Sequence, residues 1–170
     1  MHPLNYLPHL LLTSLITLSG SALALDSDRQ QPISLEADSA VMDEAKGHYV
    51  YKGNVVVTQG SMIISAASVE ILMNDSDNID SFHAIGSDTA QAHLQQTTES
   101  DKSQLDAWAD DLVYAVAKDI IILTGNAILN QHGNEFSGDT IQYSIANEKV
   151  KASAKPGSKQ RVKMIFNPSN

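Results

Sequence analysis

The chain has 170 residues, of which 42% are hydrophobic and 18% charged, so it is long enough and apolar enough to bury the core of one domain. It contains no cysteine, which excludes disulfide scaffolds, thiolate metal sites and cysteine nucleophiles. The formal net charge of −9 argues against a nucleic-acid partner, because phosphate binding requires a basic surface.

The charge is unevenly distributed along the chain. Residues 25–148 contain all 20 Asp and Glu but only 5 of the 11 Lys and Arg, whereas residues 149–170 contain the other 6 basic residues. Two interpretations of this basic end stay open. Lysines keep an exposed edge strand soluble, and a basic segment can also contact an acidic surface or a phosphorylated ligand.

Residues 1–24 have the pattern of a cleaved signal peptide. An apolar run between Leu4 and Leu18 is broken by threonine and serine, and it is short for an anchor that must cross a bilayer of roughly 30 Å. Ala22-Leu23-Ala24 then forms an A-x-A type cleavage site, although no Lys or Arg precedes the apolar run. We therefore predict an exported mature chain, with an uncleaved membrane anchor as the alternative.

An internal repeat occupies most of the mature chain. Residues 36–71 and 108–143 align at an offset of 72 without a gap. A duplicated supersecondary unit predicts stacked modules that share one core. The nine identical pairs are Ala37/Ala109, Asp38/Asp110, Val41/Val113, Ala45/Ala117, Lys46/Lys118, Gly53/Gly125, Asn54/Asn126, Gln59/Gln131 and Ser65/Ser137.

The repeated pattern is typical of short strands, since no segment shows a sustained 3.6-residue apolar period. Gly-Asn pairs and short polar linkers at Asn74–Asn78 and Gln96–Ser103 are expected to separate these strands. The predicted fold class is all-β, as a sandwich, barrel or jelly roll. In chain order, the expected strands are Ile33–Leu35, Tyr49–Tyr51, Val55–Thr58, Met62–Ile71, Leu105–Val116, Ile120–Leu123, Ala127–Asn130, Phe136–Ile145 and Arg161–Phe166.

Comparison of the two copies indicates which side chains face inward. Positions 52/124, 58/130 and 70/142 are polar in both copies and are expected to face water, so their strand neighbours face the interior. Most inward residues are expected to be core residues. The candidate interior residues are Ile33, Leu35, Tyr49, Tyr51, Val57, Ile64, Tyr114, Val116, Leu123, Phe136, Ile141 and Tyr143.

No catalytic or metal-binding motif is present. Adjacent acids such as Asp43-Glu44 and Asp110-Asp111 point to opposite faces of a strand, so they cannot flank one scissile bond. We therefore predict no enzyme activity, no catalytic residue, no metal and no cofactor. The histidines that lack a second ligand at metal spacing, and are expected on the surface or in loops, are His48, His83, His93 and His132.

Two stretches carry a family resemblance. Gln31–Asp38 and Tyr51–Gly60 include the pattern G-N-V-x-V-x-Q-G, and Lys118–Ala127 with Gly138–Tyr143 includes L-T-G-N-A. On these motifs the chain resembles the OstA-like family of lipopolysaccharide transport proteins over residues 31–166. The resemblance implies a twisted antiparallel β-jelly roll over residues 25–166, open at both ends, with a short tail at 167–170.

The resemblance also implies a function in the periplasm. Lipid A acyl chains of lipopolysaccharide would lie inside the roll, and protomers would join head to tail. An inner-membrane-anchored LptC-like partner would bind one end and an outer-membrane LptD-like partner the other. The family's lipid contacts fall on Ile33, Leu35, Tyr114 and Val116; a further aromatic contact aligns with Gln91 or Ala92, neither of which is aromatic.

The last expected strand offers an edge for self-association, because its unpaired backbone is a template for another strand. The interface residues predicted there are Arg161, Val162, Lys163, Met164, Ile165 and Phe166. Three other functions stay open. The first is a lipid shuttle that does not oligomerise, and the second a scaffold without lipid. The third is a carbohydrate-active enzyme or lectin, which needs acids or aromatics on one open face, where the chain has only Trp108 as tryptophan.

Overall fold

The computed structural model describes residues 28, 30–98, 103–157 and 161–167. The predicted signal peptide and residues 168–170 of the predicted tail lie outside this range. The described residues form twelve strands and three 3₁₀ turns, with no α-helix among them. None of their helical turns is long and apolar enough to cross a membrane. The predicted all-β fold is confirmed.

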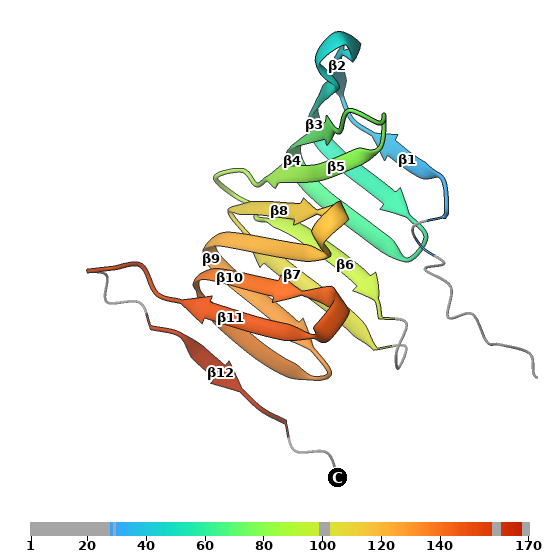
Figure 1. Ribbon diagram of the computed structural model, residues 1–170. Helices are drawn as coiled ribbons and strands as arrows, with labels where there is room; N and C mark the ends of the chain where they lie inside the picture. Colours follow the sequence, from blue (N-terminus) through green and yellow to red (C-terminus); the bar gives the residue numbers. More distant parts are fainter. Residues whose placement is uncertain (1–27, 29, 99–102, 158–160, 168–170) are drawn as a thin grey trace, which may run out of the picture.

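Figure 1 shows the elements coloured in chain order. The first half contains β1 (Ile33–Glu36), β2 (Ser39–Asp43), η1 (Glu44–Lys46), β3 (His48–Gln59), β4 (Met62–Met73), β5 (Ile79–Ile85) and β6 (Ala92–Thr97). The second half contains β7 (Gln104–Ala109), β8 (Asp111–Ala115), η2 (Val116–Lys118), β9 (Ile120–Gln131), β10 (Asn134–Ser144), η3 (Ile145–Asn147), β11 (Lys149–Ser153) and β12 (Lys163–Ile165).

The duplication is visible in these bounds. β8, η2 and β9 repeat β2, η1 and β3 at an offset of 72 residues, with no change of length. The segment Leu105–Val116, predicted as strand, forms the two strands β7 and β8, which are separated at Asp110, and its last residue, Val116, begins η2. The internal duplication is therefore present in the structure. We call β1–β6 the first module and β7–β12 the second module.

Four long strands fold the sheet into two layers. All neighbouring strands are antiparallel, and β3 pairs with β2 along residues 48–52 but with β1 along residues 56–59. In the same way β4 changes partner from β6 to β5, β9 from β8 to β7, and β10 from β12 to β11. Each long strand thus contributes one half to each layer, and the result is the jelly roll of Figure 1.

Gly-Asn pairs create the corners of this roll. Gly125 and Asn126 have φ angles of 78° and 48°, a left-handed conformation that glycine and asparagine tolerate. The Gly125 carbonyl accepts a hydrogen bond from the Asp110 N–H (3.0 Å), and the Asn126 amide donates to the Asp110 carboxylate (2.9 Å). Gly53, Asn54 and Asp38 repeat the arrangement in the first module.

These corners correct one expectation. The sequence indicates one short strand before and one after each Gly-Asn pair, whereas β3 and β9 run through the pair without interruption. Hydrogen bonding continues on both sides of the corner, to different partners, so the pair changes the direction of the strand rather than ending it. The last strand is also shorter than expected, since β12 covers only Lys163–Ile165 of 161–166.

The core lies between the layers, and the described strands leave both ends of the roll unpaired. β1 and β2 each pair only with β3 at one end, and β11 and β12 each pair only with β10 at the other. The roll is therefore open at both ends, as the resemblance implies.

Candidate functional site

The inner face of the roll is a continuous apolar surface. Directly opposed residues share a face, and Val57 lies opposite Ile64 while Leu123 lies opposite Ile141. Phe82 lies opposite Tyr114, and the two rings stack with centroids 6.3 Å apart. The interior thus joins residues from both modules into one apolar lining.

The structure places the twelve predicted interior residues in three groups. The fully buried ones are Val57, Ile64, Tyr114, Leu123, Ile141 and Tyr143. The partly buried ones that pack against this core are Leu35, Tyr49, Tyr51, Val116 and Phe136. Ile33 is 36% exposed, because it lies on the edge strand β1 at an open end.

Four further buried residues of the interior were not predicted from the sequence. Phe82 and Ala84 on β5 and Leu94 on β6 lie between the aligned copies, and Leu112 on β8 lies inside the second copy, opposite Ala40 in the alignment. Comparison of the copies was silent for β5 and β6, since their counterparts follow the aligned region. The alternation Ala92-His93-Leu94 in β6 is the signal that could have found that strand.

The apolar lining reaches the surface at both ends of the roll. At one end Met42 lies opposite Tyr49 and is 58% exposed. At the other end Met164 lies opposite Phe136, and Phe166 packs edge-to-face on the Phe136 ring with centroids 6.1 Å apart. Phe166 is nevertheless 64% exposed. An apolar surface that continues to both ends can be extended by another apolar surface placed against either.

A cavity of about 460 Å³ opens between the layers, and most of the residues that line it come from the first module. Ile33 and Val116, both among the aligned family contacts, lie in its wall together with Phe82. Ile33 comes from β1 and Val116 from η2, so the two modules build this cavity jointly. The remaining lining residues are Gln31, Gln59, Met73, Asp77, Asn78 and Ile79.

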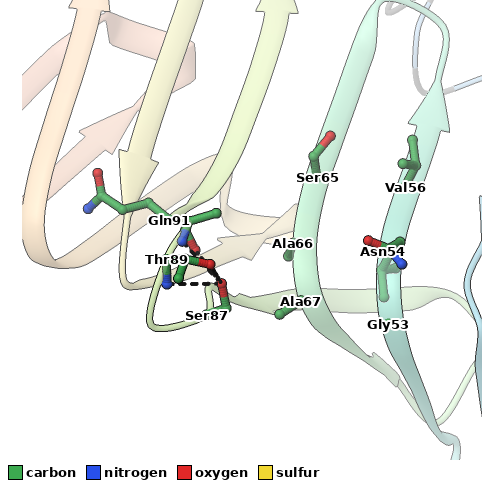
Figure 2. Close-up of a pocket in the computed structure, with 11 residues that line it drawn as sticks. Gly53, Asn54, Val56, Ser65, Ala66, Ala67, Ser87, Thr89 and Gln91 are labelled. Atoms are coloured by element: carbon green, nitrogen blue, oxygen red, sulfur yellow. Dashed lines mark hydrogen bonds between the residues drawn. The ribbon is translucent and has the colours of Figure 1, made fainter.

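A second cleft, of about 600 Å³, lies over the corners of β3 and β4 (Figure 2). Its walls are the corner residues 53–56, the segment 65–67 of β4 and the loop 87–91. Gln91 leaves this loop toward the β9 corner, where its amide donates to Asp110 Oδ1 (3.2 Å) and to the Asn126 carbonyl (3.1 Å). Gln91 therefore supports a corner, and Ala92 is buried, so neither replaces the aromatic contact of the family.

Of the four histidines named above, three lie on strands, not in loops, and pair with a carboxylate of another strand. His83 Nε2 lies 2.8 Å from Asp111, and His48 Nε2 lies 3.5 Å from Glu70. His93 Nε2 lies 3.0 Å from Asp106. No group of three metal-ligating side chains occurs in the part of the chain that the structure describes. The sequence gives no sign of these pairs, because each partner is distant along the chain.

The predicted interface residues 161–166 are exposed along their length. On one side β12 pairs with Glu135–Ser137 of β10, and its other edge has no strand partner among the described residues. Lys163 and Ile165 alternate with the inward-facing Met164. The edge therefore presents free backbone groups.

A two-layered β-roll with an apolar interior and unpaired strands at both ends defines a class of open jelly rolls. Within this class, the sequence profile described as "LptA/(LptD N-terminal domain) LPS transport protein" matches residues 34–149. The chain belongs to this family.

Several relatives match nearly the whole chain. The lipopolysaccharide export system protein LptH of Pseudomonas aeruginosa is 34% identical over 155 residues, which cover 88% of this chain and 87% of LptH. The export protein LptA of Escherichia coli K12 is 31% identical over 159 residues, covering 94% and 83%. A crystal structure of LptH from Pseudomonas aeruginosa, the LptA homologous periplasmic component of the lipopolysaccharide transport device, superposes with a TM-score of 0.74 at 33% identity. The superposition covers 84% of this chain and 99% of the LptH chain.

Proposed function

We propose that this protein carries lipopolysaccharide through the periplasm, with the acyl chains of lipid A between the two layers of the roll. The observation that supports this function best is the apolar lining that is open at both ends. The similarity to LptA and LptH supports the choice of ligand.

Exposure of acyl chains to water is costly. Each methylene moved into water costs roughly 0.8 kcal/mol, so a chain of about 12 carbons costs on the order of 10 kcal/mol. A carrier must cover such a chain throughout its passage. The cavity bounded by Ile33, Phe82 and Val116 offers a site of entry, and the buried lining continues from it into the second module.

We propose further that protomers join head to tail through their edge strands. The two ends of the roll differ, so contact between them is heterologous and extends as a filament instead of closing as a dimer. An inner-membrane-anchored LptC-like partner would cap one end of the bridge and an outer-membrane LptD-like partner the other. In this proposal residues 1–24 direct export and are removed, and residues 25–166 form the periplasmic domain.

The same geometry supports a role without catalysis. Asp110 is engaged by Asn126 at a corner and Asp111 by His83 on a strand, so these adjacent acids do not converge on one site. The lectin alternative rests on Trp108, whose ring stacks on His93 at 4.6 Å and is thereby partly covered.

Site-specific photo-crosslinking tests the proposal. A photoreactive residue is placed at Ile33 or Tyr114 in the interior, and a matched probe replaces the exposed Lys52. We expect lipopolysaccharide adducts at Ile33 and Tyr114 in protein isolated from the periplasm, and none at Lys52. Adducts confined to Lys52, or a sugar-only ligand in mass spectra of the purified protein, would reject the carrier function.

A further inference from the structure

The two modules differ at the rim of the roll, by which we mean the ends of the long strands that lie farthest from the Gly-Asn corners. In the second module, the Gln131 amide donates a 2.7 Å hydrogen bond to the Tyr143 hydroxyl. Gln131 is the last residue of β9 and Tyr143 is next to last in β10, so both lie at the ends of their strands farthest from the Gly125 corner. The pair is 5% and 1% exposed, respectively.

This hydrogen bond joins the two layers. The end of β9 that carries Gln131 pairs with β7 in one layer, whereas the end of β10 that carries Tyr143 pairs with β11 in the other. Both side chains point inward, because each lies two residues along its strand from a buried residue, Leu129 or Ile141, and residues two apart share a face. The bond therefore spans the interior at its rim.

The first module lacks this bridge. The counterpart of Gln131 is Gln59, but the counterpart of Tyr143 is Ile71, which has no hydrogen-bonding side chain. The Gln59 amide donates instead to the Gln31 carbonyl (3.2 Å). Gln59 lies in the wall of the 460 Å³ cavity between the layers. One module is thus open at the position where the other is tied.

We propose that Gln131 and Tyr143 form a latch that closes the rim of the second module until lipid displaces it. This inference rests on the proposed carrier function, since it assigns these two residues control over how far an acyl chain enters. Lipid then binds first at the open rim beside Ile33 and reaches Leu129 only when the latch opens. A buried hydrogen bond between the layers suits this role, because breaking it costs less than the burial of several methylenes gains.

The test compares photo-crosslinking to lipopolysaccharide at Ile33 and at Leu129. Tyr143→Phe keeps the ring and removes the hydroxyl, and Gln131→Met removes the donor at similar size. We expect each variant to raise the ratio of Leu129 to Ile33 adducts by about fivefold, the effect of losing one hydrogen bond. The double variant should add nothing further, because either single change already opens the latch.

Gln104→Met is the matched control, since the Gln104 amide also donates a hydrogen bond (3.2 Å, to Asp106 Oδ1) but the residue is exposed on β7, outside the apolar lining, so the ratio should stay unchanged. Urea unfolding of each variant verifies that it is folded. If adducts form at Ile33 but neither latch variant changes the ratio of Leu129 to Ile33 adducts, the latch is overturned. The carrier function would still stand. Absence of adducts at both positions in the unmodified protein would overturn both.

Discussion

At the scale of single residues, Asp110, Gly125 and Asn126 form a corner triad, and its residues are identical in the two copies because each has a defined part in turning the strand. Left-handed backbone at two consecutive positions turns the strand, the Asp110 N–H satisfies the Gly125 carbonyl, and the Asp110 carboxylate accepts a hydrogen bond from the Asn126 side-chain amide. A Cβ on Gly125 would lie 2.5 Å from Asp110 Oδ2, so the close approach itself requires glycine.

Gly125→Ala should destabilise the protein by about 3 kcal/mol, through left-handed strain of about 1 kcal/mol and loss of the Asp110 hydrogen bonds. Gly157→Ala is the matched control, because Gly157 has the same φ of 78° but no atom of the described residues lies within 4 Å of the point that its Cβ would occupy. It should cost only the strain, about 1 kcal/mol. Urea unfolding measures both values. Equal losses would show that contact with Asp110 contributes nothing to the corner.

At the scale of elements, an edge strand has a hydrogen-bonded strand partner on one side only, whereas a central strand has partners on both sides. Ile165 on β12 and Ile122 on β9 are 39% and 37% exposed. Both lie on outer faces, yet only Ile165 has a strand partner on one side alone among the described residues. The pair separates an effect of edge position from an effect of exposure.

Ile165→Asp should weaken self-association by about tenfold, because a new charge on the free edge must be desolvated when another strand adds to it. The free energy of unfolding should change by less than about 1 kcal/mol at this exposed edge. Sedimentation velocity measures the first quantity and urea unfolding the second.

Ile122→Asp supplies the control for that prediction. This change should leave self-association as it is, while the central position makes it cost about 1 kcal/mol or more in stability. Unchanged oligomers of the Ile165→Asp protein, or equal weakening in both variants, would remove β12 from the interface.

At the scale of the whole molecule, the two ends of the roll differ in charge. All acidic residues precede position 149, and the basic segment that follows forms β11 and β12 at one end. At the other end, Glu36 and Asp38 lie at or beside β1. Head-to-tail contact would bring the basic end to the acidic one.

Self-association should therefore weaken as salt rises. Between about 0.05 M and 0.5 M NaCl the Debye length falls below 10 Å, so attraction between exposed charges at the two ends is screened. We expect the dissociation constant to increase several-fold, measured by light scattering over a range of protein concentrations. A constant that stays the same or decreases would indicate that apolar contact alone holds protomers together.

Much of the fold could be predicted from the sequence, because the signals used are either local to one strand or come from comparing the two copies within the chain. Alternation placed Val57, Ile64, Leu123 and Ile141 on the inner face, and the 72-residue offset predicted the duplication. These signals need only the period of a strand and the comparison of two copies. The lipid contacts assigned to the interior stay predictions, as do the export signal and the interface.

Tertiary structure alone decided which strands are neighbours. Nothing local in β9 states that it leaves β8 for β7 at Asn126, or that Tyr143 meets Gln131 across the rim. Such contacts join residues that are distant along the chain, and they depend on how both layers pack together. Local sequence specifies which face of a strand is apolar, but the partner of that face is set by the shape of the whole core.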